Sequence, residues 1–133
     1  MAVFNKFNSF VEDLAEKVHN LGSDSLKIAL TNTAPTAANA QLTDITEISY
    51  TNISSRVLTT SSSAQTSGTY ALVLADLILT ASGAVGPFRY VVFYNDTSTN
   101  DRLIGWWDYG SSVSLASGET FTLDFGANVL TLA

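Results

Sequence analysis

A series of short segments in which apolar and polar residues alternate runs from Gly22 to Ala133. Alternation with a period of two is the pattern of a strand that buries one face. Short strands separated by turn residues are typical of an antiparallel sandwich or barrel. Proline, which interrupts the ladder of strand hydrogen bonds, occurs only twice in the chain. The sequence therefore predicts a mainly β fold, an antiparallel β-sandwich or barrel of about seven or eight strands.

The predicted strands differ in how they are buried. Residues 70–79 are apolar on both alternating faces apart from Asp76, which predicts a strand between two layers or against a partner. The clearest hairpin joins residues 88–95 to residues 102–108. Residues 45–50 fit either a short helix or a strand. Other strands are predicted at residues 26–30, 56–60, 112–115, 119–125 and 128–133, with a polar connector at residues 61–68.

Before Gly22 the apolar residues recur at three- and four-residue steps, which is the period of an amphipathic helix. Gly22 follows the last of them, where a left-handed cap residue is expected. Residues 1–22 are therefore predicted to form one N-terminal helix on a single domain, with the β-sandwich at residues 23–133. The apolar stripe either packs on the chain's own sheet or docks on a neighbouring subunit; it comprises Phe4, Phe7, Phe10, Val11, Leu14, Val18 and Leu21.

Charged side chains are scarce, at 14% of the residues, and the net charge is −6. The six basic residues are scattered, so no nucleic-acid partner is expected. No apolar stretch of about 20 residues could span a membrane, and residues 1–6 lack the pattern of a signal peptide. Serine and threonine replace many charges. Such a surface repels neighbours weakly and suits a subunit that contacts its own copies, although an ordinary β protein with a threonine-rich face has the same composition.

Side chains that could carry catalysis are few. The chain has no cysteine and one histidine, so the common zinc ligand sets cannot be assembled. That histidine, His19, is predicted near the end of the helix, where the helix dipole favours a positive ring. We expect no enzyme activity, no catalytic or metal-binding residue and no cofactor. Two weaker hypotheses are calcium at Asp96, Asn100 and Asp101, and a hydrolytic carboxylate pair drawn from Asp76, Asp108, Glu119 and Asp124.

The most distinctive local feature is the run Trp106-Trp107-Asp108-Tyr109. Adjacent residues on a strand point to opposite faces, so the two tryptophans are predicted on different sides of one sheet. Three roles fit this run: both tryptophans pack within the fold, an outward tryptophan anchors a subunit interface, or an outward tryptophan stacks with Tyr109 on a sugar. The candidate interface residues are Phe4, Phe7, Phe10, Trp106, Trp107 and Tyr109.

Several strings in the sequence are distinctive. They are Phe4-Asn5-Lys6-Phe7, Val11-Glu12-Asp13-Leu14, His19-Asn20-Leu21, Leu103-Ile104-Gly105-Trp106-Trp107-Asp108-Tyr109-Gly110, and residues 23–35, 44–48, 86–90, 94–97 and 118–121. Together they resemble a family of small tailed-bacteriophage proteins. The resemblance covers most of the chain, whereas residues 49–67 lack the glycine-rich pattern of that family.

The resemblance implies a virion protein that is made in the host cytoplasm and is present in many copies. The role we favour is a capsid decoration or cement protein, and the alternative is a tail or head-fibre module that binds host-surface glycan. The implied partners are copies of the chain itself, with a trimer favoured because shells offer threefold positions, and the major capsid protein or another virion protein.

Overall fold

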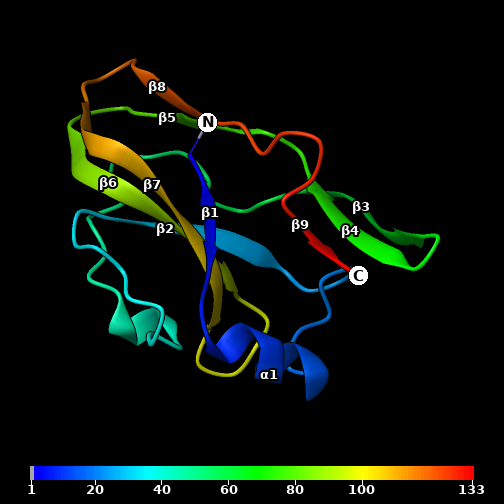
Figure 1. The fold of residues 1–133 in the computed structure, drawn as a ribbon. Coiled ribbons are helices and arrows are strands. Elements are labelled where there is room, and N and C mark those ends of the chain that lie inside the picture. The colour runs from blue at the N-terminus through cyan, green and yellow to red at the C-terminus, as the bar shows by residue number, and fades with distance from the viewer. Residues whose placement is uncertain (1) are drawn as a thin grey trace.

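Antiparallel strands form most of the structure, as the alternation predicts. The computed structural model describes residues 2–133, and 47% of the chain is strand and 8% helical. The helical elements are α1 (Ser9–Ala15) and the 3-10 helix η1 (Leu42–Asp44). The strands are β1 (Phe4–Lys6), β2 (Leu26–Thr31), β3 (Thr60–Thr66), β4 (Thr69–Leu74), β5 (Leu77–Thr80), β6 (Val85–Asn95), β7 (Arg102–Leu115), β8 (Thr120–Leu123) and β9 (Leu130–Leu132) (Figure 1).

The largest sheet has the order β1-β7-β6-β2 and is built on the long hairpin β6–β7. This is the hairpin predicted at residues 88–95 and 102–108. The separate strand predicted at residues 112–115 is instead the end of β7. Two smaller sheets, β3-β4-β9 and β5-β8, complete the fold. Together they give a sandwich-like arrangement of antiparallel layers.

The large sheet is buried on both faces. Val91 and Phe93 of β6 belong to the main core, whereas Val92 and Tyr94 of the same strand belong to a second cluster on the opposite face. The main core is closed by leucines of the smaller sheets. The second cluster is closed by Ile45, from the segment around η1. Burial on both faces explains the continuous apolar run in β6, since a strand exposed on one face would alternate. The leucines are Leu72, Leu74, Leu79, Leu123 and Leu130.

The prediction of one helix over residues 1–22 was wrong; Met1 itself lies outside the described residues. Only α1 is α-helical, and β1 pairs with β7 in the register Phe4↔Trp107 and Lys6↔Gly105. Phe4 therefore lies on a strand, and its ring occupies the space that Gly105 of β7 leaves because it has no side chain. The helix ends early because Lys17 adopts φ +68°, a conformation that no α-helix continues.

The prediction of one strand over residues 70–79 was also wrong, because the chain changes sheet at residues 75–76. Strand β4 pairs with β3 and β9, whereas β5 pairs with β8. The Asp76 carboxylate accepts a hydrogen bond from the backbone N–H of Phe125 at 2.9 Å. Asp76 therefore fixes the backbone at Phe125, after β8, and does not continue the strand ladder of β4.

Two other predicted segments lack regular structure. Residues 45–50 form neither helix nor strand, and residues 56–60 supply only an isolated bridge before β3 begins. Separate backbone hydrogen bonds and side-chain contacts join these segments to β2 in place of a regular ladder. The Tyr50 hydroxyl accepts a hydrogen bond from the backbone N–H of Leu30 at 3.0 Å, and the Arg56 guanidinium lies 3.6 Å above the Tyr50 ring. This segment covers the outer edge of β2, which would otherwise be free to pair.

Candidate interaction surface

Three of the six predicted interface residues are buried inside the chain. Phe7, Phe10 and Trp107 are 0%, 2% and 7% exposed, respectively. Phe10 and Trp107 belong to the main core and Phe7 to the second cluster. Their side chains have no surface to offer a partner, so this part of the predicted interface is corrected. The physical reason is that the large sheet is covered on both faces: Phe7 and Phe10 supply part of that cover, and Trp107 is a residue of β7 that the cover buries.

The other three candidates are half-buried. Phe4 packs on Trp107 with ring centroids 5.2 Å apart, and Trp106 packs on Phe7 at 4.6 Å. Tyr109 makes an edge-to-face contact with Phe121 at 5.1 Å. The two tryptophans lie on opposite faces of the sheet, as strand geometry predicts. Packing within the fold is therefore the main role of this aromatic run.

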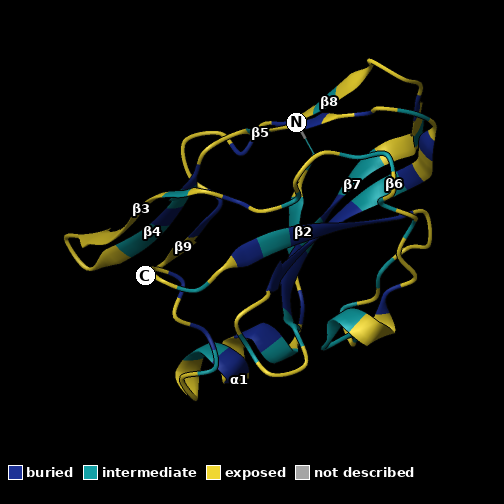
Figure 2. Ribbon diagram, turned by 180° about the vertical axis from the view of Figure 1, so that it is seen from behind, coloured by how far each residue is buried: buried dark blue, intermediate teal, exposed yellow. Residues whose placement is uncertain are grey.

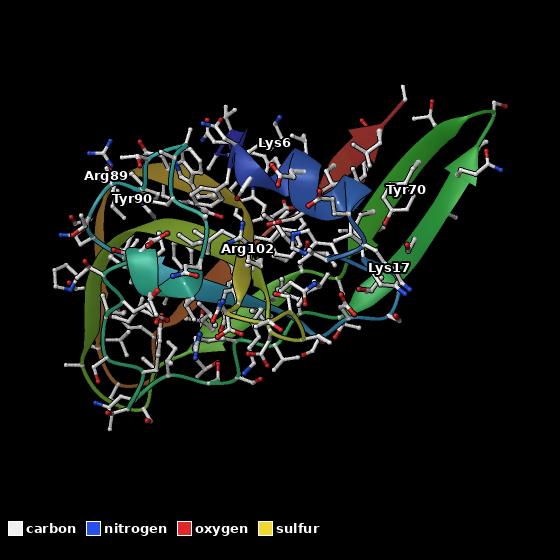
Figure 3. All side chains as sticks on the ribbon, turned by 90° about the horizontal axis from the view of Figure 1, so that it is seen from below. Lys6, Lys17, Tyr70, Arg89, Tyr90 and Arg102 are labelled. Atoms are coloured by element: carbon white, nitrogen blue, oxygen red, sulfur yellow. The ribbon has the colours of Figure 1, made fainter. Side chains whose placement is uncertain are left out.

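The most prominent feature of the surface is a hairpin of β3 and β4 that projects from the body of the molecule (Figures 1 and 3). We call residues 60–74 the arm. All residues from 61 to 69 are exposed, and Figure 2 shows β3 exposed along its length. Ser67 and Gly68, with φ of +50° and +84°, form its two-residue turn, whose positive φ angles match the twist of the flanking strands.

The predicted polar connector at residues 61–68 is thus the distal part of this arm. The pattern contains one signal that could have revealed it, since Ser-Gly is a turn dipeptide and threonines flank it on both sides. Apolar alternation, the stronger strand signal, is absent because neither face of β3 is buried. Strand β3 forms because β4 offers it a ladder, from Thr66↔Thr69 back to Thr60↔Leu74.

The arm carries no charge. Residues 57–75 contain no Asp, Glu, Lys or Arg, although the whole chain has twelve acidic and six basic residues. Its proximal half is anchored by β9 and by the buried side chains of Leu72 and Leu74. The inner side of the arm faces a hollow of about 500 Å³ shared with Lys17 and Leu21 (Figure 3). In this hollow the hydroxyls of Ser63 and Tyr70 lie 2.8 Å apart.

A buried polar network joins α1 to the β6–β7 hairpin at the end of the large sheet. Asn95 is fully buried, and its Nδ2 contacts His19 Nδ1 at 3.0 Å and donates to the Asp24 carboxylate at 2.6 Å. Its Oδ1 accepts from the backbone N–H groups of Thr97 and Ser98. These two hydrogen bonds to Oδ1 fix the orientation of the Asn95 amide, so Nδ2 donates to Nδ1 of His19. The neutral His19 ring therefore carries its proton on Nε2.

The prediction of a positively charged His19 at a helix end is corrected by this burial. Desolvation lowers the pKa of His19 below its ordinary value of 6.5, against the opposing carboxylates of Asp13 and Asp24. Its Nε2 has no hydrogen-bond partner and lies 4.0 Å from the Asp13 carboxylate, which itself pairs with Arg102 at 2.8 Å. The ring is therefore neutral and structural.

This network makes folding stability depend on pH. The unfolded chain binds a proton at His19 below about pH 6.5, whereas the folded chain binds it only at a lower pH. The neutral, buried His19 therefore contributes fully to the free energy of unfolding above about pH 6.5, and this contribution is lost as the pH falls below that value. We expect a lower melting temperature at about pH 5 than at about pH 8. His19→Asn keeps an acceptor for Asn95 and should flatten the slope. An equal slope in both proteins, measured by calorimetry, would contradict this assignment.

The four carboxylates considered for hydrolysis are engaged separately. Asp76 binds the backbone N–H of Phe125, and Glu119 accepts from the backbone N–H of Ala116 at 2.7 Å. Asp108 pairs with Arg89 through two hydrogen bonds of 2.8 and 3.1 Å. Only Asp108 and Asp124 share a hollow, of about 520 Å³, with Tyr109. The hollow is lined by Ala2, Asp108, Tyr109, Gly110, Thr122 and Asp124.

The charge state of Asp108 argues against a role as a general acid. The hydrogen bonds from Arg89, and then the one from the backbone N–H of Gly110, hold the pKa of Asp108 below its usual value. A carboxylic acid that protonates a leaving group needs the opposite shift. The hollow therefore places the carboxyl oxygens of Asp108 and Asp124 beside the aromatic ring of Tyr109.

The loop considered for calcium is organised by other contacts. Asp96 pairs with Lys27 at 3.3 Å, and Asn100 and Asp101 adopt positive φ angles at the turn before β7. Within residues 2–133, no three His, Cys, Asp or Glu side chains lie together in a way that could hold a metal ion. The same part of the chain includes no helix long and apolar enough to cross a membrane.

Comparisons with protein-family models, with curated proteins and with solved structures find no match to this chain.

Proposed function

We propose that the chain is a structural protein of a bacteriophage virion, most specifically a decoration or cement protein of the capsid. The observation that carries the proposal is the projecting, uncharged arm. The distal part of the arm, residues 61–69, is exposed throughout and contributes little to the stability of its own domain, because it buries almost no apolar surface. The arm can bury this exposed surface by contact with a neighbouring molecule. The resemblance of the sequence to small tailed-bacteriophage proteins supports the virion as the place of that contact.

The body of the molecule suits such a role. Its large sheet is covered on both faces, so the arm projects from a well-packed base that can hold it in one direction. The partners we propose are further copies of the chain and the major capsid protein or another virion protein. Contacts of this kind need not be large, since many symmetric copies on one shell add avidity.

The test is a copy count in purified particles of the phage that encodes the chain. Quantitative mass spectrometry should find this protein at a ratio to the major capsid protein that is fixed and close to stoichiometric. Particles made without the gene should assemble but lose their contents at a lower temperature than complete particles. A handful of copies per particle would exclude capsid decoration and would point to the tail.

A second candidate function is favoured by the hollow around Tyr109. An aromatic ring beside the carboxylates of Asp108 and Asp124 is a combination that suits a sugar, which stacks on the ring and donates its hydroxyls to the oxygens. Trp107 cannot serve in this way because it is buried. We propose this reading, a tail or head-fibre module for host glycan, as the alternative. Retention of the chain on a glycan array, together with a low copy number, would favour it over the capsid role.

A further inference from the structure

We propose that the outer edge of β3 pairs with the same edge of a second copy of this chain. The two arms then form one continuous antiparallel sheet across a twofold axis. The inference rests on the proposed function, because both assign the arm to assembly. It adds the identity of the partner and the strand that makes the contact.

The first support is the state of the sheet edges. Strand β3 is the outer strand of its sheet and has seven residues, and nothing else in residues 2–133 pairs with its outer side. The edge strands β1, β5, β8 and β9 have three, four, four and three residues. The edge of β2 is covered by the Tyr50–Arg56 segment. Short or covered edges are the usual protection against strand pairing, and β3 is the long edge that lacks it.

The second support is the composition of that edge. Proteins that keep an exposed edge from pairing place lysine, proline or another charge on it, or a bulge within it. Strand β3 reads Thr-Ser-Ser-Ser-Ala-Gln-Thr and has none of these residues. Its one register shift lies between Thr60 and Ser62, at the root of the arm, so residues 62–66 form a regular ladder. Small hydroxyl side chains let two such strands approach, and Ser/Thr pairs across strands add favourable contacts.

The third support is electrostatic and selects a second copy as the partner. Each chain carries a net charge of −6, so two copies repel each other over most of their surfaces. The stretch from residue 57 to residue 75 has no charge, and contact there places no like charges opposite each other. A basic partner would instead be attracted to the acidic remainder of the surface. An antiparallel contact of one strand with itself also closes by a twofold axis. The structure thus favours a pair over the trimer expected from shell symmetry.

The fourth support is geometric. The arm projects beyond the body of the molecule, so its distal part is separated from the other strands of the chain (Figures 1 and 3). Strand β9 supports β4 only from Tyr70 to Leu72, and the distal pair Thr66↔Thr69 has no third strand. Two-stranded ribbons are marginal in water, and a partner's β3 supplies the missing strand on the other side.

The experiment uses a matched pair of lysine substitutions. Ala64, Ala71 and Thr131 lie in one row across the sheet, with Ala64 on the β3 edge and Thr131 on the opposite β9 edge. Ala64 is the middle residue of the regular ladder 62–66, so a twofold axis at its centre places Ala64 opposite Ala64 of the second copy. Ala64→Lys then brings two lysines together at the proposed contact, whereas Thr131→Lys adds the same charge on the other side. Sedimentation equilibrium should show a wild-type dimer, an unchanged Thr131→Lys dimer, and a dissociation constant raised more than about tenfold by Ala64→Lys.

A charge-swap variant separates repulsion from misfolding. Ala64→Glu alone should also weaken association, and a mixture of Ala64→Lys and Ala64→Glu chains should restore it. A monomeric wild type, an unaffected Ala64→Lys dimer, or a mixture that stays monomeric would each overturn the inference. If the wild type is monomeric and Ala64→Lys abolishes binding to particles, the β3 edge pairs with a shell protein instead. A monomer found in many copies on particles would refute the pairing alone, whereas a β3 dimer absent from particles would refute the proposed function alone.

Discussion

Replacing Gly105 with alanine is expected to detach β1 from the large sheet and to destabilise the protein by about 3 kcal/mol. A Cβ on this residue would collide with the ring of Phe4 and would lie 2.6 Å from the backbone oxygen of Asn5. The ring cannot simply move aside, because it packs against Trp107. The backbone oxygen belongs to a paired strand and cannot yield without loss of the ladder. Thermal or urea unfolding measures the loss, and exchange of the β1 amide protons shows where it occurs.

Gly22→Ala is the matched control for this prediction. Its Cβ would meet the side-chain oxygen of Ser63 at 3.1 Å, and a serine side chain on the exposed arm can rotate away. We expect a change in stability within about 0.5 kcal/mol. If Gly105→Ala were equally harmless, β1 would not be held in the groove that the missing side chain leaves on β7.

Replacing Asn95 with aspartate is expected to destabilise the protein by about 3–5 kcal/mol at neutral pH, although the two side chains have nearly the same shape. The new carboxylate would place an oxygen where Nδ2 now donates to Asp24 at 2.6 Å and contacts His19 Nδ1 at 3.0 Å. A buried carboxylate would then face a second carboxylate and an acceptor nitrogen. Urea unfolding at about pH 8 measures this loss in full.

The loss should shrink as the pH falls. Protonation of His19 puts a proton on Nδ1, and the new carboxylate can accept a hydrogen bond from it. Acid therefore relieves the repulsion that the Asn95→Asp substitution creates. The wild-type protein has the opposite slope, because burial lowers the pKa of His19 in the folded state. Protonation would also turn Nδ1 into a donor that faces the donor Nδ2 of Asn95. Asn128→Asp, at an exposed position, is the control and should change stability by less than about 0.5 kcal/mol at either pH. Parallel slopes in Asn95→Asp and the wild type would show that His19 does not face this amide as its proton acceptor.

The two predictions concern the two places where β1 and α1 are fixed to the sheet. Gly105 admits the strand, and Asn95 holds the turn around His19 and Asp24 that follows the helix. The arm takes part in neither, so we expect substitutions at Ala64 to alter association without altering the fold. This separation allows the assembly hypothesis to be tested on a folded protein.

Local alternation was sufficient to predict the fold class, the β6–β7 hairpin and the opposite orientations of Trp106 and Trp107. These features follow from the alternation of side chains along a strand, which depends only on neighbouring residues and not on distant parts of the chain. The short N-terminal helix was also predicted, but its length was not, because Phe4 and Phe7 fit a helical stripe as well as they fit a strand. The groove at Gly105 decides between them, and it is 101 residues away from Phe4.

The tertiary structure alone decided which aromatic residues are surface and which are core. Sequence patterns identify apolar side chains but cannot show that the large sheet is covered on both faces, which is what buries Phe7, Phe10 and Trp107. The arm escaped prediction for a related reason. Strand β3 is polar on both faces and forms because its backbone pairs with β4. Every residue except proline can make such backbone hydrogen bonds, so they produce no recognisable pattern in the sequence.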